Sequence, residues 1–246
     1  MLIEKVKNAI LKSKLLKVFI FIILIVILIF YLRLFLTTGI RYDDTFLKKE
    51  VVASETHYDG NSSYGALHIE VNKLKNNKNS LEVIYNLPRG INQHFLVNFI
   101  DVDTWSSGIN IKNDTGEVLF EGTYQKDQPF LIDKNGEPFV EDAIQIIMNE
   151  ESPYNSDYKI YLKNTADLAC FSTESVRGNY ALLIVAILLL IIIVIDIRFP
   201  LFFFYLHNFL SVKDPEPSDL YLFIQRISWY VGLVIVIILF ISAVAT

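Results

Sequence analysis

The chain has 246 residues, 52% of them hydrophobic, and a mean hydropathy of +0.38. Soluble domains contain about 45–50% apolar residues, so this composition argues against a wholly soluble protein. The formal net charge is −5, yet residues 37–179 alone contain 13 basic and 22 acidic side chains. Such an acidic region repels phosphate groups, so we expect no nucleic acid partner.

Three apolar blocks carry the excess hydrophobicity. Each approaches the length of about 20 residues that an α-helix needs to cross the hydrocarbon core of a bilayer. Their length and their lack of alternation exclude ordinary β-strands, so we predict three transmembrane helices. The predicted segments in chain order are a basic N-terminus at 1–17, a helix at 18–36, a domain at 37–179, a helix at 180–197, a loop at 198–226 and a helix at 227–246.

Charges that flank the first block predict the orientation of the chain. The block follows one acidic residue and five lysines, which are Glu4, Lys5, Lys7, Lys12, Lys14 and Lys17. Because flanking lysines stay on the cytoplasmic side, we expect a multi-pass plasma membrane protein with a cytoplasmic N-terminus and an extracytoplasmic domain. A cleaved signal peptide is the alternative, but the block exceeds the roughly 7 to 15 residues of a signal core. The composition, rich in Lys, Asn and Ile, favours a bacterial membrane.

The domain at 37–179 alternates apolar and polar residues, as β-strands with one buried face do. The pattern recurs at residues 67–71, 81–85, 94–100 and 117–121. Turn-forming residues separate these runs at 73–79, 88–90, 106–108 and 113–116. Strands at this spacing favour an antiparallel β-sandwich.

The second half of the domain departs from this rhythm. Apolar residues at helical spacing predict a short helix over 141–150. Residues 158–163 alternate again, and residues 166–171 are interpreted as a last strand. The predicted fold class is a membrane protein with three transmembrane α-helices and a mainly β, sandwich-like extracytoplasmic domain that includes one or two short helices.

Histidines and carboxylates of the domain are candidate metal ligands, because imidazole and carboxylate groups suit zinc. The candidates for one shared ion are His57, Asp59, His68 and His94. Separate hydrogen-bonded histidines on a sheet surface account for their spacing equally well. A second pair, Asp101 and Asp103, shares one face at a strand end and could bind calcium, although a solvated strand end also explains it.

The sequence contains no recognised motif for nucleophilic, phosphate-binding or zinc-helix catalysis. Cys170 is the one cysteine. It lies in an apolar stretch, and we interpret it as a small buried side chain. Because one cysteine cannot form an internal disulfide, the domain depends on its apolar core. We expect no cofactor, and an enzyme is the less favoured interpretation.

The loop at 198–226 contains the least generic sequence of the membrane part. An aromatic run after Pro200 is too short to cross a bilayer and predicts a helix in the membrane interface. Ser218 is placed to cap the helix that becomes the third span. The candidate interaction residues are Phe202, Phe203, Phe204, Pro215 and Pro217. Contact with another membrane protein is one interpretation of them, and an aromatic belt at the lipid surface is the other.

Three functional hypotheses follow from the sequence. The first is a membrane-anchored extracytoplasmic binding or accessory module within a larger membrane assembly, with lipid and another membrane or cell-surface protein as its partners. The second is an extracytoplasmic hydrolase or metal-dependent enzyme. The third is a sensor that relays an outside signal to the loop at 198–226.

Overall fold

The computed structural model describes residues 14–74, 79–100, 106–126, 128–141, 152–155, 157–208 and 216–245. The chain divides into two compact units. One consists of Met1–Thr37 with Arg177–Thr246, and the other consists of Thr38–Val176. We call them the helical unit and the β unit.

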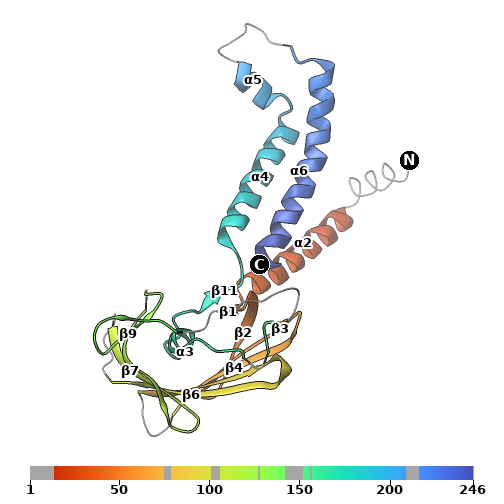
Figure 1. Ribbon diagram of the computed structural model, residues 1–246. Helices are drawn as coiled ribbons and strands as arrows, with labels where there is room; N and C mark the ends of the chain where they lie inside the picture. The colour runs from red at the N-terminus through yellow and green to blue at the C-terminus, as the bar shows by residue number, and fades with distance from the viewer. Residues whose placement is uncertain are drawn as a thin grey trace. The chain divides into compact units, whose positions relative to one another are not determined.

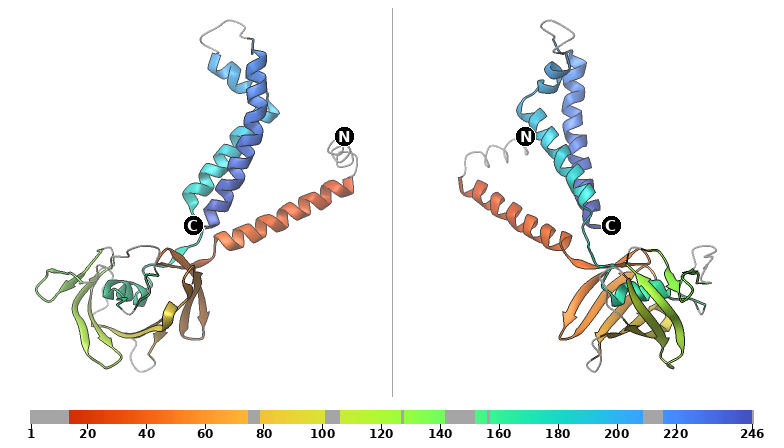
Figure 2. Two further views of the ribbon diagram at one scale, coloured as in Figure 1. Left: turned by 45° about the vertical axis from the view of Figure 1, so that its right-hand side comes forward. Right: turned by 90° about the vertical axis from the view of Figure 1, so that its left-hand side faces the viewer.

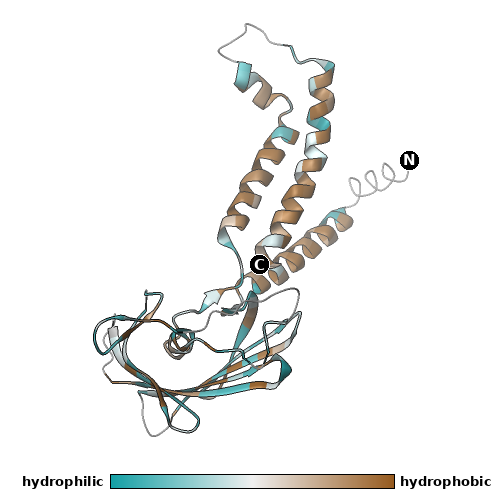
Figure 3. Cartoon of the chain, viewed as in Figure 1, coloured by the Kyte–Doolittle hydropathy of each residue, from teal (hydrophilic) through white to brown (hydrophobic). Residues whose placement is uncertain are grey.

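The helical unit contains α2 (Lys14–Phe35), α4 (Tyr180–Arg198), α5 (Phe202–Asn208) and α6 (Asp219–Ala245). Three of these, α2, α4 and α6, are long and apolar enough to cross a membrane, which confirms the three predicted apolar helices. Figure 3 shows α4 and most of α2 in the brown of hydrophobic residues, whereas the first half of α6 also contains teal and white turns. The last helix begins at Asp219, so it includes residues that the sequence pattern assigns to the loop. Ser218 caps it as predicted, because its Oγ accepts a hydrogen bond from the backbone N–H of Tyr221 at 3.2 Å.

Helices α4 and α6 pack side by side (Figure 2). Small residues at their interface allow a close approach, as is usual between membrane helices. A Cβ atom added at Gly232 would lie 2.7 Å from Cδ1 of Ile193. At the other end of α4, the side chain of Asn179 caps the helix, and its backbone N–H donates to the carbonyl of Ala243 at 2.8 Å.

The β unit is built on one antiparallel sheet of eleven strands. The strands are β1 (Thr38–Tyr42), β2 (Thr45–Val52), β3 (Glu55–Ser62), β4 (Gly65–Lys73), β5 (Ser80–Leu87), β6 (Ile91–Phe99), β7 (Ser106–Asn113), β8 (Val118–Gln125), β9 (Leu131–Asp133), β10 (Pro138–Phe139) and β11 (Ser175–Val176). The first ten follow one another in chain order across the sheet, and β11 returns to pair with β1. The chain therefore enters and leaves the β unit on neighbouring strands.

The sheet curves around a segment of its own chain (Figure 1). This segment, which we call the strap, comprises residues 152–155 and 157–174 and includes α3 (Leu162–Ala169). Buried residues of the strap and of β1 to β9 form one hydrophobic core. The large antiparallel sheet is confirmed, but the two packed sheets of a sandwich are not, because the strap lies where a second sheet would be.

Two predictions within the strap are wrong. Residues 158–163 were expected to be a strand, yet residues 158–161 are irregular and α3 begins at Leu162. Burial still alternates along residues 158–161, because the side chains of Tyr158 and Ile160 lie in the core. The alternation in the sequence therefore reflects an extended segment that pairs with no described strand. Residues 166–171 also belong largely to α3 rather than to a strand. The predicted helix at 141–150 lies outside the described residues, apart from Glu141.

Glu141 explains part of why α3 forms where strands were expected. Its carboxylate accepts hydrogen bonds from the backbone N–H groups of Leu162 at 2.8 Å and Lys163 at 3.3 Å. These donors have no partner within a helix, and a negative charge there also complements the helix dipole. A long-range cap of this kind is invisible to local sequence patterns.

A third wrong prediction concerns residues 106–108, which were expected to form a turn but begin β7. Gly108 pairs with Thr123 of β8. The side chain of Ile100 lies close to the position that a Cβ at Gly108 would occupy, at 3.2 Å. Glycine therefore serves close packing at this position rather than chain reversal. The predicted turns at 88–90 and 113–116 are present.

Candidate functional site

The face of the sheet that points away from the strap is polar. Successive residues of a strand point to opposite faces, so the side chains that alternate with the buried core form this surface. We call it the polar face. Its polar members on β2 to β7 include Lys48, Glu50, Glu55, His57, Asp59, His68, Glu70, Asn72, Glu82, Asn86, Asn92, His94, Asn98, Asn110 and Lys112. The same register also places Val52, Ala66, Ile84 and Leu96 on this face.

Two predicted metal-ligand candidates, His57 and His68, meet Glu70 on this face. His57 on β3 is the direct cross-strand partner of Glu70 on β4, and Asp59 is the partner of His68. The Nε2 atom of His68 lies 2.7 Å from Oε1 of Glu70, and Nδ1 of His57 lies 3.9 Å from the same oxygen. One ligand atom from each of the three residues lies within 4.8 Å of the other two. We call these three residues the histidine cluster.

Two further carboxylates flank the histidine cluster. The Nδ1 atom of His68 lies 2.5 Å from Oδ1 of Asp59, and Nε2 of His57 lies 3.6 Å from Oε2 of Glu55. The two imidazole rings stack with their centroids 5.5 Å apart. Burial of the ring lowers the pKa of His68, but the hydrogen bonds and charges of Asp59 and Glu70 outweigh it, so the pKa is raised above its ordinary value.

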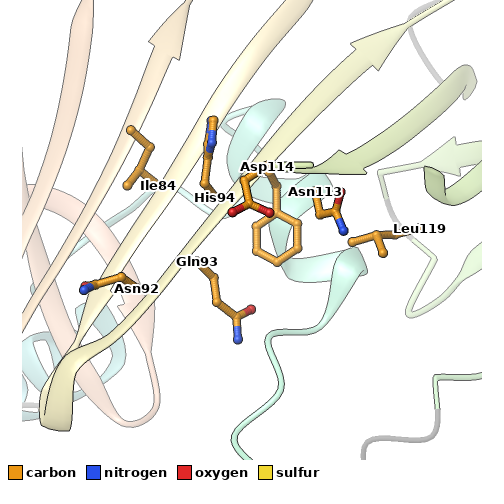
Figure 4. A pocket seen from close by; sticks show the side chains of 8 residues that line it. Ile84, Asn92, Gln93, His94, Asn113, Asp114 and Leu119 are labelled. Atoms are coloured by element: carbon orange, nitrogen blue, oxygen red, sulfur yellow. The ribbon is translucent and has the colours of Figure 1, made fainter. Parts of the chain in front are cut away.

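His94 does not join the histidine cluster. Its Nε2 atom lies 2.7 Å from Oε1 of Glu82, although the ring is not aligned for a hydrogen bond. His94 lines a hollow of about 460 Å³ between β5, β6 and the turn from β7 to β8 (Figure 4). Asp114 from that turn lines the same hollow. It opens where β6 extends past the end of β7, because their pairing starts only at Phe95.

The remaining sequence candidates fall elsewhere. Asp101, Asp103 and Pro215 lie outside the described residues. The three phenylalanines at 202–204 are on α5. Phe204 packs against Tyr221 of α6 with ring centroids 5.0 Å apart, so at least one of these aromatic side chains has a partner within the helical unit.

Tyrosine hydroxyls fix the strap to the sheet, and sequence patterns did not single them out. Tyr158 donates to Oδ2 of Asp43 at 2.6 Å and lies 2.9 Å from the hydroxyl of Tyr42. Tyr154 donates to the same carboxylate oxygen at 3.0 Å. Asp43 sits in the turn from β1 to β2 with a φ of 44°, a conformation that aspartate tolerates better than most residues. Burial raises the pKa of all three tyrosines, so they stay neutral.

Two carboxylates of the strap complete this inner network. Glu174 accepts hydrogen bonds from Tyr58 and from Nζ of Lys49, each at 2.6 Å. Asp167 on α3 accepts from Tyr124 at 2.8 Å and pairs with Lys163 one helical turn earlier. These hydroxyl and carboxylate groups on the concave side of the sheet are thus satisfied by one another. The many tyrosines in the sequence were the one available signal.

Cys170 ends α3 and is half-buried. Burial raises the pKa of its thiol to about 11. A thiol with such a pKa is almost entirely protonated at neutral pH, and the thiolate is the reactive form. The local environment therefore does not activate Cys170 as a nucleophile.

A second polar group lies within the helical unit. Asp196 near the end of α4 accepts hydrogen bonds from Nε2 of Gln225 at 2.9 Å and from Nε1 of Trp229 at 2.6 Å. Gln225 is buried. These hydrogen bonds join α4 to α6, a pairing that local sequence patterns do not reveal.

Comparison with known proteins adds one observation. No curated protein and no solved structure matches the chain. Residues 185–243, which include Asp196, Gln225 and Trp229, match a family model described as a family of unknown function (DUF6199).

Proposed function

We propose that the chain is a membrane-anchored binding module, an accessory part of a larger membrane assembly. Its β unit faces the extracytoplasmic side of a plasma membrane, its N-terminus and the connection between α4 and α6 face the cytoplasm, and the polar face contacts a protein or a cell-surface component. The lysines before and at the start of α2 support this orientation, because they resist transfer across the membrane.

One observation carries the proposal. The concave side of the sheet is occupied by the strap, whose hydroxyl and carboxylate groups already have partners. A ligand therefore meets the β unit on its outer surface. The chemically versatile side chains, including His57 and His68, gather on that opposite surface, the polar face, where a broad sheet suits contact with a macromolecule.

The same arrangement favours binding over catalysis. Hydrolytic sites gain much of their effect from excluding water around the reacting atoms. The histidine cluster instead lies on a solvent-facing sheet, with about a third of the His68 side chain exposed. The hypothesis of a hydrolase or metal-dependent enzyme and the hypothesis of a sensor stay predictions.

Site-specific photocrosslinking tests the proposal. A photoreactive residue placed at the exposed Glu50 on β2, or at Asn86 on β5, reports what contacts the polar face in native membranes. Asn135, exposed in the turn between β9 and β10, provides the matched control. We expect one discrete adduct of the same mass from Glu50 and Asn86 and none from Asn135. The same adduct from all three positions, or no adduct from the polar face, would contradict the proposal.

A further inference from the structure

The histidine cluster has the composition of a transition-metal site. Two imidazoles and one carboxylate are a ligand set that binds zinc with a fourth position left for water. Calcium and magnesium prefer oxygen ligands alone, so two nitrogen donors select against them. We propose that His57, His68 and Glu70 bind one divalent transition metal ion, with Zn²⁺ the representative ion.

The strand register places the three donors. His57 and Glu70 are direct cross-strand partners, and His68 precedes Glu70 by two residues on the same strand. All three side chains therefore project from one face. Their ligand atoms lie within 4.8 Å of one another, and tetrahedral coordination at zinc–ligand distances near 2 Å places such atoms roughly 3.3 Å apart. The proposed site therefore requires the three side chains to rotate until their ligand atoms reach that spacing.

The neighbouring carboxylates strengthen the argument. Metal-bound histidines commonly donate their other ring N–H to a carboxylate, which fixes the tautomer and raises ligand basicity. Asp59 stands at Nδ1 of His68 and so directs its Nε2 toward Glu70. Glu55 approaches Nε2 of His57, which leaves Nδ1 on the side of Glu70. Each histidine thus has one nitrogen at an outer carboxylate and the other at the proposed site.

Charge also favours a cation at this place. Glu55, Asp59 and Glu70 surround two imidazoles. Their charged cross-strand neighbours on β2 are Glu50, opposite His57, and one basic residue, Lys48, opposite Asp59. The ligand nitrogen of each imidazole must be deprotonated to bind the ion.

The test uses the full chain in detergent, carrying an affinity tag without histidine and stripped of metal by a chelator. Competition with a chromophoric zinc indicator measures stoichiometry and affinity. We expect one Zn²⁺ per chain, with affinity reduced by at least about 100-fold in His57→Ala and His68→Ala. His94→Ala is the matched control, because it removes a histidine with a carboxylate neighbour from the same face, and we expect unchanged affinity.

The Asp59→Asn variant tests the site even if removal of a ligand side chain disturbs folding. Asp59→Asn retains all three donors and alters only a positioning residue. We expect a reduction in affinity of about 10- to 100-fold, together with an unchanged circular dichroism spectrum. The absorption of bound Co²⁺ in the visible region reports whether the nitrogen ligands are retained.

Three results would overturn the inference. They are the absence of stoichiometric Zn²⁺ binding, equal loss of affinity in His94→Ala, and unchanged affinity in both Asp59→Asn and the folded ligand variants. None of these results bears on the crosslinking pattern of the polar face, so failure of the metal site and failure of the proposed function are distinguishable.

Discussion

At the scale of single residues, the buried hydroxyl groups decide how firmly the strap is held. Tyr158→Phe removes the donor to Asp43 and leaves the hydroxyl of Tyr42 without its partner at 2.9 Å. An unsatisfied buried polar group costs about 1–3 kcal/mol, so we expect a loss of unfolding free energy of that size. Urea unfolding of the full chain in detergent, followed by near-ultraviolet circular dichroism, measures it.

Tyr64→Phe is the control for that substitution. Tyr64 is exposed, and its ring packs edge-on against Tyr154, a contact that phenylalanine retains. We expect a change within about 0.5 kcal/mol, as for most surface substitutions. Equal losses in the two variants would show that the hydroxyl network does not secure the strap.

His68 should make the stability of the fold depend on pH. The pKa of His68 is raised in the folded state, so protonation stabilises the fold. This contribution is fully present below the unfolded pKa of about 6.5 and is lost as the pH rises through the higher folded value. We expect His68→Gln to lose more stability at pH 6 than at pH 9, measured by urea unfolding with a chelator present. Asp59→Asn should reduce the same pH dependence, and a deficit that grows with pH would contradict the assignment.

At the scale of elements, the sheet depends on close backbone approach at a few glycines. A Cβ at Gly39 would lie 2.0 Å from the carbonyl oxygen of Leu47 on β2, and backbone cannot move aside cheaply. Overpacking of this kind typically costs about 1–3 kcal/mol. Gly39→Ala should therefore destabilise the β unit, as measured by limited proteolysis. Ser175→Ala, at the exposed partner of Gly39 on β11, should change little.

The helical pair α4 and α6 offers a separate test of an element. Asp196→Ala deprives Gln225 and Trp229 of their shared acceptor. Hydrogen bonds between membrane helices contribute on average about 0.6 and at most about 1.7 kcal/mol, so we expect a modest loosening. The rate of disulfide formation between Ile193→Cys and Gly232→Cys in a Cys170→Ser background reports it. Asp219→Ala, at the exposed start of α6, should leave that rate unchanged.

Local patterns predicted some of these elements and missed others for physical reasons. Alternation of apolar and polar residues located parts of β4, β5, β6 and β8, because each of these strands has one face in the core and one face toward solvent. It failed in the strap, where Tyr158 and Ile160 are buried from an irregular extended segment. It also could not predict the partnership of His57 with Glu70, since cross-strand register depends on the turn between β3 and β4. His57 and His68 were candidates by chemistry alone, and their separation from His94 required the fold.

In the whole molecule, the proposed binding role of the β unit requires each segment to face a particular compartment. We propose that α2, α4 and α6, which are long and apolar enough to do so, each cross the membrane. The basic N-terminal region and the connection between α4 and α6 should share one side, opposite the β unit. This arrangement explains why an acidic unit of ordinary globular composition is linked to helices with continuous apolar surfaces.

Labelling of single cysteines reports which side of the membrane each segment faces. In a Cys170→Ser background, Thr115→Cys places a thiol in the exposed turn between β7 and β8, and Glu216→Cys places one before α6. A membrane-impermeant maleimide added to intact spheroplasts should label the first variant, and should label the second only after permeabilisation. The reverse pattern, or labelling of both variants without permeabilisation, would contradict the account.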